Sequence, residues 1–153
     1  GLRSKLGLTT ASTEDEALAK DFLSLLTKNQ CDFTLAFRRI SELADENMES
    51  SVSPLFEFPE GFAPWLDRWR ARCFAEEISS AERHARMHRT NPSLIPRNHL
   101  IEQAIKDAYN GDFGLFHRLN DRLSSPFDEM SGDEAMARPP SSDQIVHQTF
   151  CGT

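Results

Sequence analysis

The sequence predicts an all-α fold, a small bundle of about five or six helices followed by an extended C-terminal tail. Three observations favour this fold. Apolar residues recur at helical spacing through most of residues 13–123, and capping residues, prolines and glycines fall at the ends of these segments. From Ser124 onward the helical pattern gives way to turn-forming residues. With 153 residues, the chain is long enough to bury one core.

Two helices are predicted in the first part of the chain. Ser12 or Thr13, followed by three acidic residues, is typical of a helix N-terminus, and this helix is expected to run to about Lys28. Asp32 is the expected cap of the next helix. Their apolar stripes are Leu18, Phe22, Leu25 and Leu26 in the first, and Phe33, Phe37, Ile40, Leu43 and Ala44 in the second. We expect the two to pack antiparallel as a hairpin.

Residues 46–61 read as a connector, because they combine Ser, Glu and two prolines. We expect this connector to place Leu55, Phe56 and Phe58 on the bundle. Pro64 suits the first turn of a third helix. The apolar face of that helix is formed by Trp65, Leu66, Trp69 and Cys73. Residues 74–88 either continue it or form a separate helix.

A break is predicted at Asn91-Pro92, since a residue before proline is disfavoured in helical conformation. Pro96 opens the next helix, and Gly111 stands where a left-handed residue would end it. The apolar stripe of this helix is Leu100, Ile101, Ala104, Ile105 and Ala108.

The last predicted helix begins after Asp112 and carries Phe113, Phe116, Leu119 and Leu123. Asp112-Phe113-Gly114 spells the metal-binding tripeptide of protein kinases, but it follows a helix rather than a buried strand, so we interpret Asp112 as a helix cap. The predicted organisation is therefore a helical domain over residues 1–123 and a turn-rich tail over residues 124–153.

Charge and composition exclude several classes of function. The net charge of -7 argues against binding to nucleic acid or to an anionic membrane surface, which both require a strong cationic surface. No apolar run approaches the roughly 18 residues that span a bilayer, and no signal peptide is apparent. Three widely spaced cysteines do not suggest a disulfide scaffold. We expect a cytoplasmic protein.

Arginines are concentrated between residues 68 and 97, without lysine among them. Arg68, Arg72 and Arg97 are candidate contacts for an anion or an acidic partner, because guanidinium groups bind carboxylates and phosphates bidentately. A solvent-exposed basic face is the alternative. His84 and His88 lie four residues apart, but zinc needs a third protein ligand that the spacing does not supply, so no metal site is predicted.

The three cysteines differ in setting. Cys31 and Cys73 fall near apolar stripes, where buried structural thiols are expected. Cys151 lies third from the C-terminus, where a thiol is accessible, so it is the redox candidate, with a spectator thiol as the alternative. No catalytic residue is predicted in this chain.

Several stretches, taken in order, resemble the C-terminal part of the selenoprotein O family of kinase-like protein adenylyltransferases. These are Leu2–Leu8 (LRSKLGL), Asp32–Ile40 (DFTLAFRRI), Asn91–Ile105 (NPSLIPRNHLIEQAI), Gly111–Leu119, Ser125–Glu129 (SPFDE), Pro139-Pro140 and Phe150–Thr153. Cys151 occupies the place of the family's cysteine or selenocysteine, whereas Gly152-Thr153 replaces the Ser-Ser of other members.

The resemblance implies an enzyme that transfers AMP from ATP to protein hydroxyls, using magnesium and a kinase-like domain that lies upstream. Its nucleotide- and metal-binding residues have no counterparts here, so none is carried over. We therefore expect a non-catalytic domain without its own cofactor, whose partners are the missing kinase-like domain and the protein substrates. The alternative is a stand-alone helical protein-interaction module.

Overall fold

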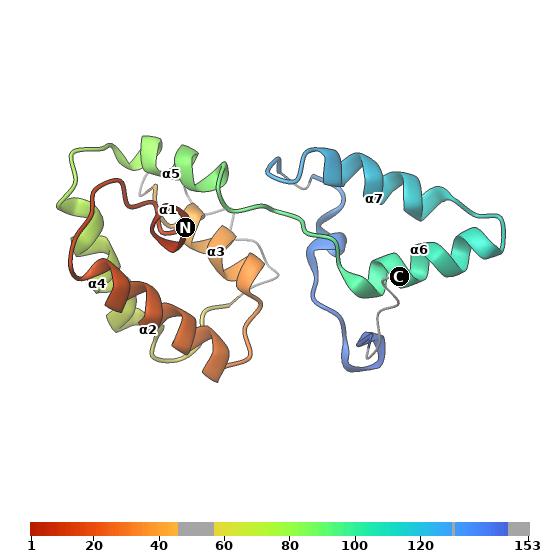
Figure 1. The fold of residues 1–153 in the computed structure, drawn as a ribbon, viewed down its shortest axis with the longest axis horizontal. Helices are drawn as coiled ribbons and strands as arrows, with labels where there is room; N and C mark the ends of the chain where they lie inside the picture. The colour runs from red at the N-terminus through yellow and green to blue at the C-terminus, as the bar shows by residue number, and fades with distance from the viewer. Residues whose placement is uncertain (46–56, 130, 147–153) are drawn as a thin grey trace. The chain divides into compact units, whose positions relative to one another are not determined.

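The computed structural model describes residues 1–45, 57–129 and 131–146, and within these ranges it contains seven α-helices, two short 3-10 helices and no strand (Figure 1). The helices are α1 (Leu2–Lys5), α2 (Asp15–Lys28), α3 (Phe33–Glu42), α4 (Phe62–Phe74), α5 (Ser80–His88), α6 (Asn98–Tyr109), α7 (Gly114–Ser124), η1 (Glu134–Ala137) and η2 (Ser142–Gln144). The all-α prediction is confirmed. Among the described residues, no helix combines the length and apolar character needed to cross a bilayer.

The chain forms two compact units, residues 1–92 and 93–153. The first contains α1 to α5 and the second contains α6, α7 and both 3-10 helices. The boundary between the units coincides with the predicted break at Asn91-Pro92. The predicted boundary after residue 123 lies within the second unit, in which Met136 and Ala137 of η1 are buried.

Aromatic side chains form the centre of the first unit. The Trp65 ring stacks on Phe22 with 4.4 Å between centroids, and the Trp65 Nε1 donates a hydrogen bond to the Leu18 carbonyl at 2.8 Å. Helix α2 therefore packs mainly against α4, while α3 packs mainly against α5. The expected hairpin of α2 and α3 is a minor contact, made by the Phe22 and Phe37 rings at 5.2 Å.

Most helix ends follow the sequence signals. The Asp32 carboxylate accepts a hydrogen bond from the Leu35 N–H at 2.9 Å, which confirms the predicted cap of α3. The Ser79 hydroxyl caps α5 in the same way, so residues 80–88 form a helix separate from α4. Pro64 lies in the first turn of α4, as expected. Residues 46–56 of the predicted connector lie outside the described residues.

The second unit is built on the antiparallel helices α6 and α7 (Figure 1). Gly111 has a φ of 85° between them, which confirms the predicted left-handed position. The Asp112 carboxylate accepts a hydrogen bond from the N–H of Gly114, the first residue of α7, at 2.8 Å. The N-cap residue is Phe113, one position after the predicted cap. The buried core of this unit comprises Leu94, Ala104, Leu119 and Met136.

The turn after α1 joins the N-terminal segment to α4 and α5. Gly7 has a φ of 72° between the buried Leu6 and Leu8. The Trp69 Nε1 donates a hydrogen bond to the Leu6 carbonyl at 2.9 Å. A Cβ atom at Gly7 would lie 2.5 Å from the Met87 sulfur, whose side chain is fully buried. This position therefore requires glycine both for its backbone conformation and for space.

We expect Gly7→Ala to lower the free energy of unfolding by about 3 kcal/mol, because left-handed strain and overpacking each contribute roughly 1–2 kcal/mol. Gly61→Ala is the matched control. Gly61 has a similar φ of 86°, but a Cβ there would meet nothing within 4 Å. It should lose only the strain part, about 1 kcal/mol. Urea unfolding of both variants measures the difference, and equal losses would contradict the packing argument.

Candidate functional site

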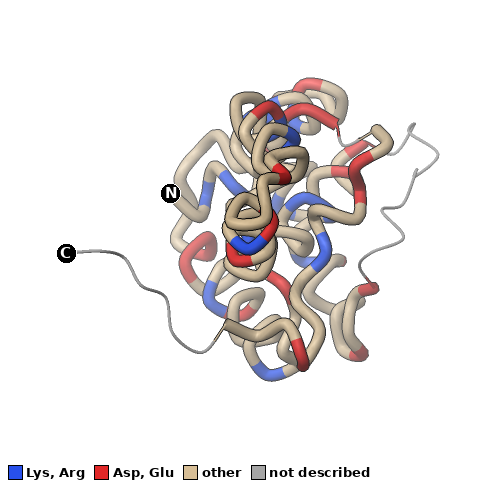
Figure 2. The backbone as a smooth tube through the Cα atoms, turned by 90° about the vertical axis from the view of Figure 1, so that its right-hand side faces the viewer, with Lys and Arg blue, Asp and Glu red and all other residues tan. Residues whose placement is uncertain are grey.

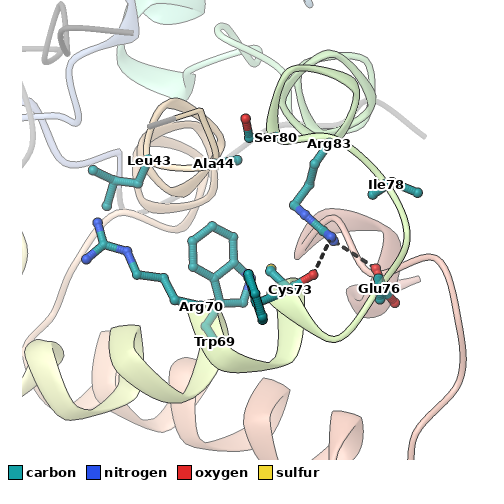
Figure 3. Close-up of a pocket in the computed structure, with 10 residues that line it drawn as sticks. Leu43, Ala44, Trp69, Arg70, Cys73, Glu76, Ile78, Ser80 and Arg83 are labelled. Carbon is teal, nitrogen blue, oxygen red and sulfur yellow. Dashed lines mark hydrogen bonds and ion pairs between the residues drawn. The ribbon is translucent and has the colours of Figure 1, made fainter. Parts of the chain in front are cut away.

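A pocket of about 280 Å³ lies in the first unit between the end of α3, α4 and α5. Its lining residues are Leu43, Ala44, Trp69, Arg70, Cys73, Phe74, Glu76, Ile78, Ser80 and Arg83. Figure 3 shows Glu76 and Arg83 facing each other at one end of the pocket, with Trp69 near its centre and Arg70 at another side. The pocket thus combines apolar walls with one carboxylate and two guanidinium groups.

Glu76 follows the end of α4, and its side chain is only 1% exposed. One carboxylate oxygen lies 2.8 Å from Arg83 Nη1, and the other lies 3.1 Å from Arg72 Nη1. The carboxylate also accepts hydrogen bonds from the Thr9 and Thr10 N–H groups and from the Thr10 hydroxyl, at 2.9–3.1 Å. Every side of this carboxylate is therefore occupied by a donor.

These contacts decide the ionisation of Glu76. Burial by itself would raise the pKa of Glu76, but hydrogen bonds from Arg83 and from the two threonines outweigh it and lower the pKa to about 2. At neutral pH the group is a carboxylate with a very low proton affinity. It is consequently a poor general base, and its donors leave no oxygen open to a metal ion.

The two arginines extend the contacts of Glu76. Arg72 Nε donates to the Asp15 carboxylate at 2.8 Å, and Arg83 donates to the Gly7 and Cys73 carbonyls at 2.6 and 2.7 Å. Asp15, Arg72, Glu76 and Arg83, here called the Glu76 network, thus connect residues 7–10, the start of α2, the end of α4 and α5. The geometry of the Glu76 network supports a structural role.

The three candidate arginines occupy different settings. Arg68 pairs with Asp21 at 2.7 Å, and both side chains are 52% exposed. Arg72 belongs to the Glu76 network and is only 11% exposed. Arg97 is buried in the second unit, where it donates to the Ala137 carbonyl at 2.7 Å. Their role as anion or partner contacts stays a prediction, and Arg68 is the member whose guanidinium reaches solvent.

Charged residues of both signs occur in the same helices, as Figure 2 shows along the backbone. Glu76, around which Arg72 and Arg83 are arranged, was not among the residues predicted from the sequence. A signal was present, since Glu76 lies four residues after Arg72 and seven before Arg83. The involvement of Thr9 and Thr10 could not be anticipated, because they are 66 or more residues away in sequence.

A half-buried thiol and a pair of imidazoles lie in the first unit. Burial raises the pKa of the Cys73 thiol to about 11, although the Arg83 charge acts in the opposite direction, so Cys73 stays protonated at neutral pH. The His84 and His88 rings lie 3.9 Å apart, yet the described part of the chain has no group of three residues suited to a metal ion. Cys151 lies outside the described residues.

The residues of the pocket do not fit ATP with magnesium. Ligand pockets usually enclose about 300–1,000 Å³, so a pocket of about 280 Å³ is small for a nucleotide. Magnesium requires open carboxylate oxygens, and those of Glu76 are already occupied by donors.

Replacing Glu76 should show that the Glu76 network stabilises the fold. We expect Glu76→Gln to lower the free energy of unfolding at pH 7 by about 3–5 kcal/mol, because the buried Arg83 guanidinium loses its anion and Arg72 keeps only Asp15. The pKa of Glu76 is lower in the folded state than its usual 4.5. The stabilisation is therefore complete above pH 4.5 and disappears as the pH falls towards 2.

Urea unfolding of wild type and variant between pH 2 and pH 7 measures this effect. Glu82→Gln is the control, since Glu82 forms a half-exposed pair with Arg86 and should change stability by less than about 1 kcal/mol. A constant difference between wild type and Glu76→Gln across the pH range would contradict the assignment.

Comparisons with known proteins identify sequences similar to this chain. The family model described as Protein adenylyltransferase SelO matches residues 1–124. A relative from Bradyrhizobium diazoefficiens named Protein nucleotidyltransferase YdiU is 45% identical over 154 residues, which cover 100% of this chain and 31% of the relative. Relatives of the same name from Rhodopseudomonas palustris (strain BisB5) and Rhizobium meliloti are 44% and 43% identical, with 100% of this chain and 32% of each relative covered.

The chain therefore spans about a third of the length of the curated relatives it matches. The family match extends from the N-terminal segment through α7, so it includes the Glu76 network and the α6–α7 hairpin. The resemblance found in the sequence is confirmed, and the chain belongs to the SelO family of protein adenylyltransferases.

Proposed function

We propose that this chain is the helical C-terminal domain of a protein adenylyltransferase that moves AMP from ATP onto Ser, Thr or Tyr hydroxyls of proteins. The observation that carries the proposal is the match to relatives named nucleotidyltransferases, of which the chain covers only 31–32%. In this proposal a kinase-like domain in the remainder of the polypeptide binds ATP and magnesium. The present chain is non-catalytic and supports that domain.

The geometry of the first unit supports a scaffolding role. Its best-placed carboxylate, Glu76, is committed to Arg72, Arg83 and backbone N–H groups, so its charge holds segments of the fold together. Cys73 in the same pocket is a protonated thiol at neutral pH. Side chains that in an active site would act on a substrate are here engaged with their own chain.

Further features of the proposed protein follow from the same assignment. Its partners are the kinase-like domain of the same polypeptide and the protein substrates of the whole enzyme, and it acts in the cytoplasm. The net charge of -7 supports protein partners over nucleic acid or an anionic membrane. Arg68 remains the candidate for a contact with an acidic surface, because its guanidinium is half exposed.

The isolated chain should be unable to transfer AMP. We expect no labelled AMP on a generic protein acceptor incubated with ATP, magnesium and this chain, because the pocket offers no open metal ligand. A full-length chimera, in which this chain replaces the matched segment of the Bradyrhizobium relative, is expected to label the acceptor. Incorporation of label is followed by mass spectrometry. Transfer by the isolated chain would refute the non-catalytic role, and an inactive but folded chimera would refute the adenylyltransferase assignment.

Cys151 is proposed as a redox-responsive latch in the full-length enzyme, on the basis of its place in the terminal motif. We expect mild oxidation to change the AMP-transfer rate of the chimera and Cys151→Ala to abolish that change. Cys73→Ala is the matched control, because a thiol with a pKa of about 11 reacts slowly at neutral pH. An unchanged redox response in Cys151→Ala would remove the latch from the proposal.

A further inference from the structure

The second unit exposes a row of large apolar side chains. Ile101, Ile105 and Tyr109 of α6 are 39%, 48% and 89% exposed, and Phe113 and Phe116 at the start of α7 are 51% and 52% exposed. The three residues of α6 are spaced four apart, so they form one stripe along the helix. These five residues are here called the apolar strip.

The apolar strip lies on one side of the α6–α7 hairpin. Both helices are right-handed and run antiparallel around a core stripe that contains Ala104 and Leu119. On α6 each of Ile101 and Ile105 directly follows a core-facing residue, Leu100 or Ala104, and on α7 Phe116 directly follows Leu115. On both helices the exposed residues are therefore rotated from the core stripe in the same sense. In an antiparallel pair these two flanks meet on the same side. This geometry places Ile101, Ile105, Tyr109 and Phe116 on the same side of the hairpin. Phe113, the N-cap residue of α7, lies beside Phe116, since both rings are near the His117 ring, at 6.5 and 5.5 Å between centroids.

Helix α6 thus carries a wider apolar arc than its own unit uses. Ala104 is buried and Leu100 packs against the same core, together with Leu94, Leu119 and Met136. The neighbouring stripe of Ile101, Ile105 and Tyr109 is left in solvent. An exposed apolar surface of this kind marks an interaction site in a protein that has to remain soluble.

The polar residues beside the apolar strip on α6 carry both signs of charge. Glu102 lies 4.0 Å from Lys106, and Gln103 donates a hydrogen bond to Asp107 at 2.7 Å. This mixture does not form the strongly cationic surface that nucleic acids require. The matching surface is therefore expected to be apolar and aromatic, with a polar rim.

The size of the strip favours a contact within one polypeptide over a complex of two separate copies. From the exposed fractions, the five side chains present roughly 600 Å², given that aromatic residues bury about 150–250 Å² each. A stable complex of two separate copies usually buries about 800 Å² per partner. With a partner surface of equal size the strip would bury roughly 1,200 Å² in total, which lies within the range of about 600–1,500 Å² for an interface between domains of one polypeptide and at the lower edge of the range for two separate chains.

We propose that the apolar strip docks against the part of the polypeptide that lies outside this chain, and that this contact fixes the α6–α7 hairpin on the rest of the protein. Two observations support this occupant. The relatives are about three times as long as this chain, and the family match continues through α6 and α7 to residue 124. This inference rests on the proposed membership in a larger enzyme, but not on the chemistry of that enzyme.

Hydroxyl-radical footprinting of the isolated chain and of the chimera with the Bradyrhizobium relative tests the proposal. We expect Tyr109, Phe113 and Phe116 to be labelled at least about 5-fold less in the chimera, since docking excludes solvent from them. Phe74 is the internal reference, because it is 94% exposed in the first unit and lies outside the strip. Equal labelling of the strip in both proteins would overturn the proposal.

Variants add a second readout. Tyr109→Lys should leave the thermal unfolding of the isolated chain unchanged, because Tyr109 is 89% exposed, and should restore labelling of Phe116 in the chimera. Gln103→Lys, on another face of α6, should leave the protection intact. If the chimera does not fold, footprinting the aligned positions of the unmodified relative gives the same decision. Light scattering that shows a dimer of the isolated chain, dispersed by Tyr109→Lys, would assign the strip to a second copy instead.

The outcomes for the strip and for the proposed function are separable. Protection of the strip in a folded chimera that transfers no AMP would retain the docking surface and refute the activity. AMP transfer by a chimera whose strip is fully labelled would do the reverse.

Discussion

The buried carboxylate of Glu76 is the interaction on which the first unit depends. It binds Arg72 and Arg83 and accepts hydrogen bonds from the backbone of Thr9 and Thr10. Burying three charged groups is unfavourable unless each is paired and hydrogen-bonded. Here both carboxylate oxygens of Glu76 accept hydrogen bonds, so the N-terminal segment, α4 and α5 are joined through one buried group.

The same contacts limit the chemistry of the first unit. At neutral pH a carboxylate whose pKa is near 2 is a weak base, and a thiol whose pKa is near 11 is protonated and therefore a weak nucleophile. Aromatic packing adds to the Glu76 network. Trp65 and Trp69 are buried in the core, and each donates a hydrogen bond to a carbonyl of another segment. These features support the proposed scaffolding role of the first unit.

The second unit is held together differently. Its buried core is a small apolar cluster around Ala104 and Leu119, and α6 and α7 leave a row of large apolar residues exposed. A hairpin that buries one apolar stripe and exposes a second is typical of an element that also packs against another surface. The two units are therefore built differently, with a buried charged network in the first and an exposed apolar strip in the second.

The sequence by itself determined the helices, since local periodicity and capping residues such as Asp32, Pro64 and Gly111 act within a few residues of one another. Most of the candidate site was not predictable, because Glu76 is partnered by Thr9 and Thr10 from a distant part of the chain. The packing of α2 on α4 rather than on α3 likewise depends on how Trp65 fits against Phe22. Tertiary structure alone decided these pairings, because helical periodicity identifies an apolar face without identifying the face that covers it.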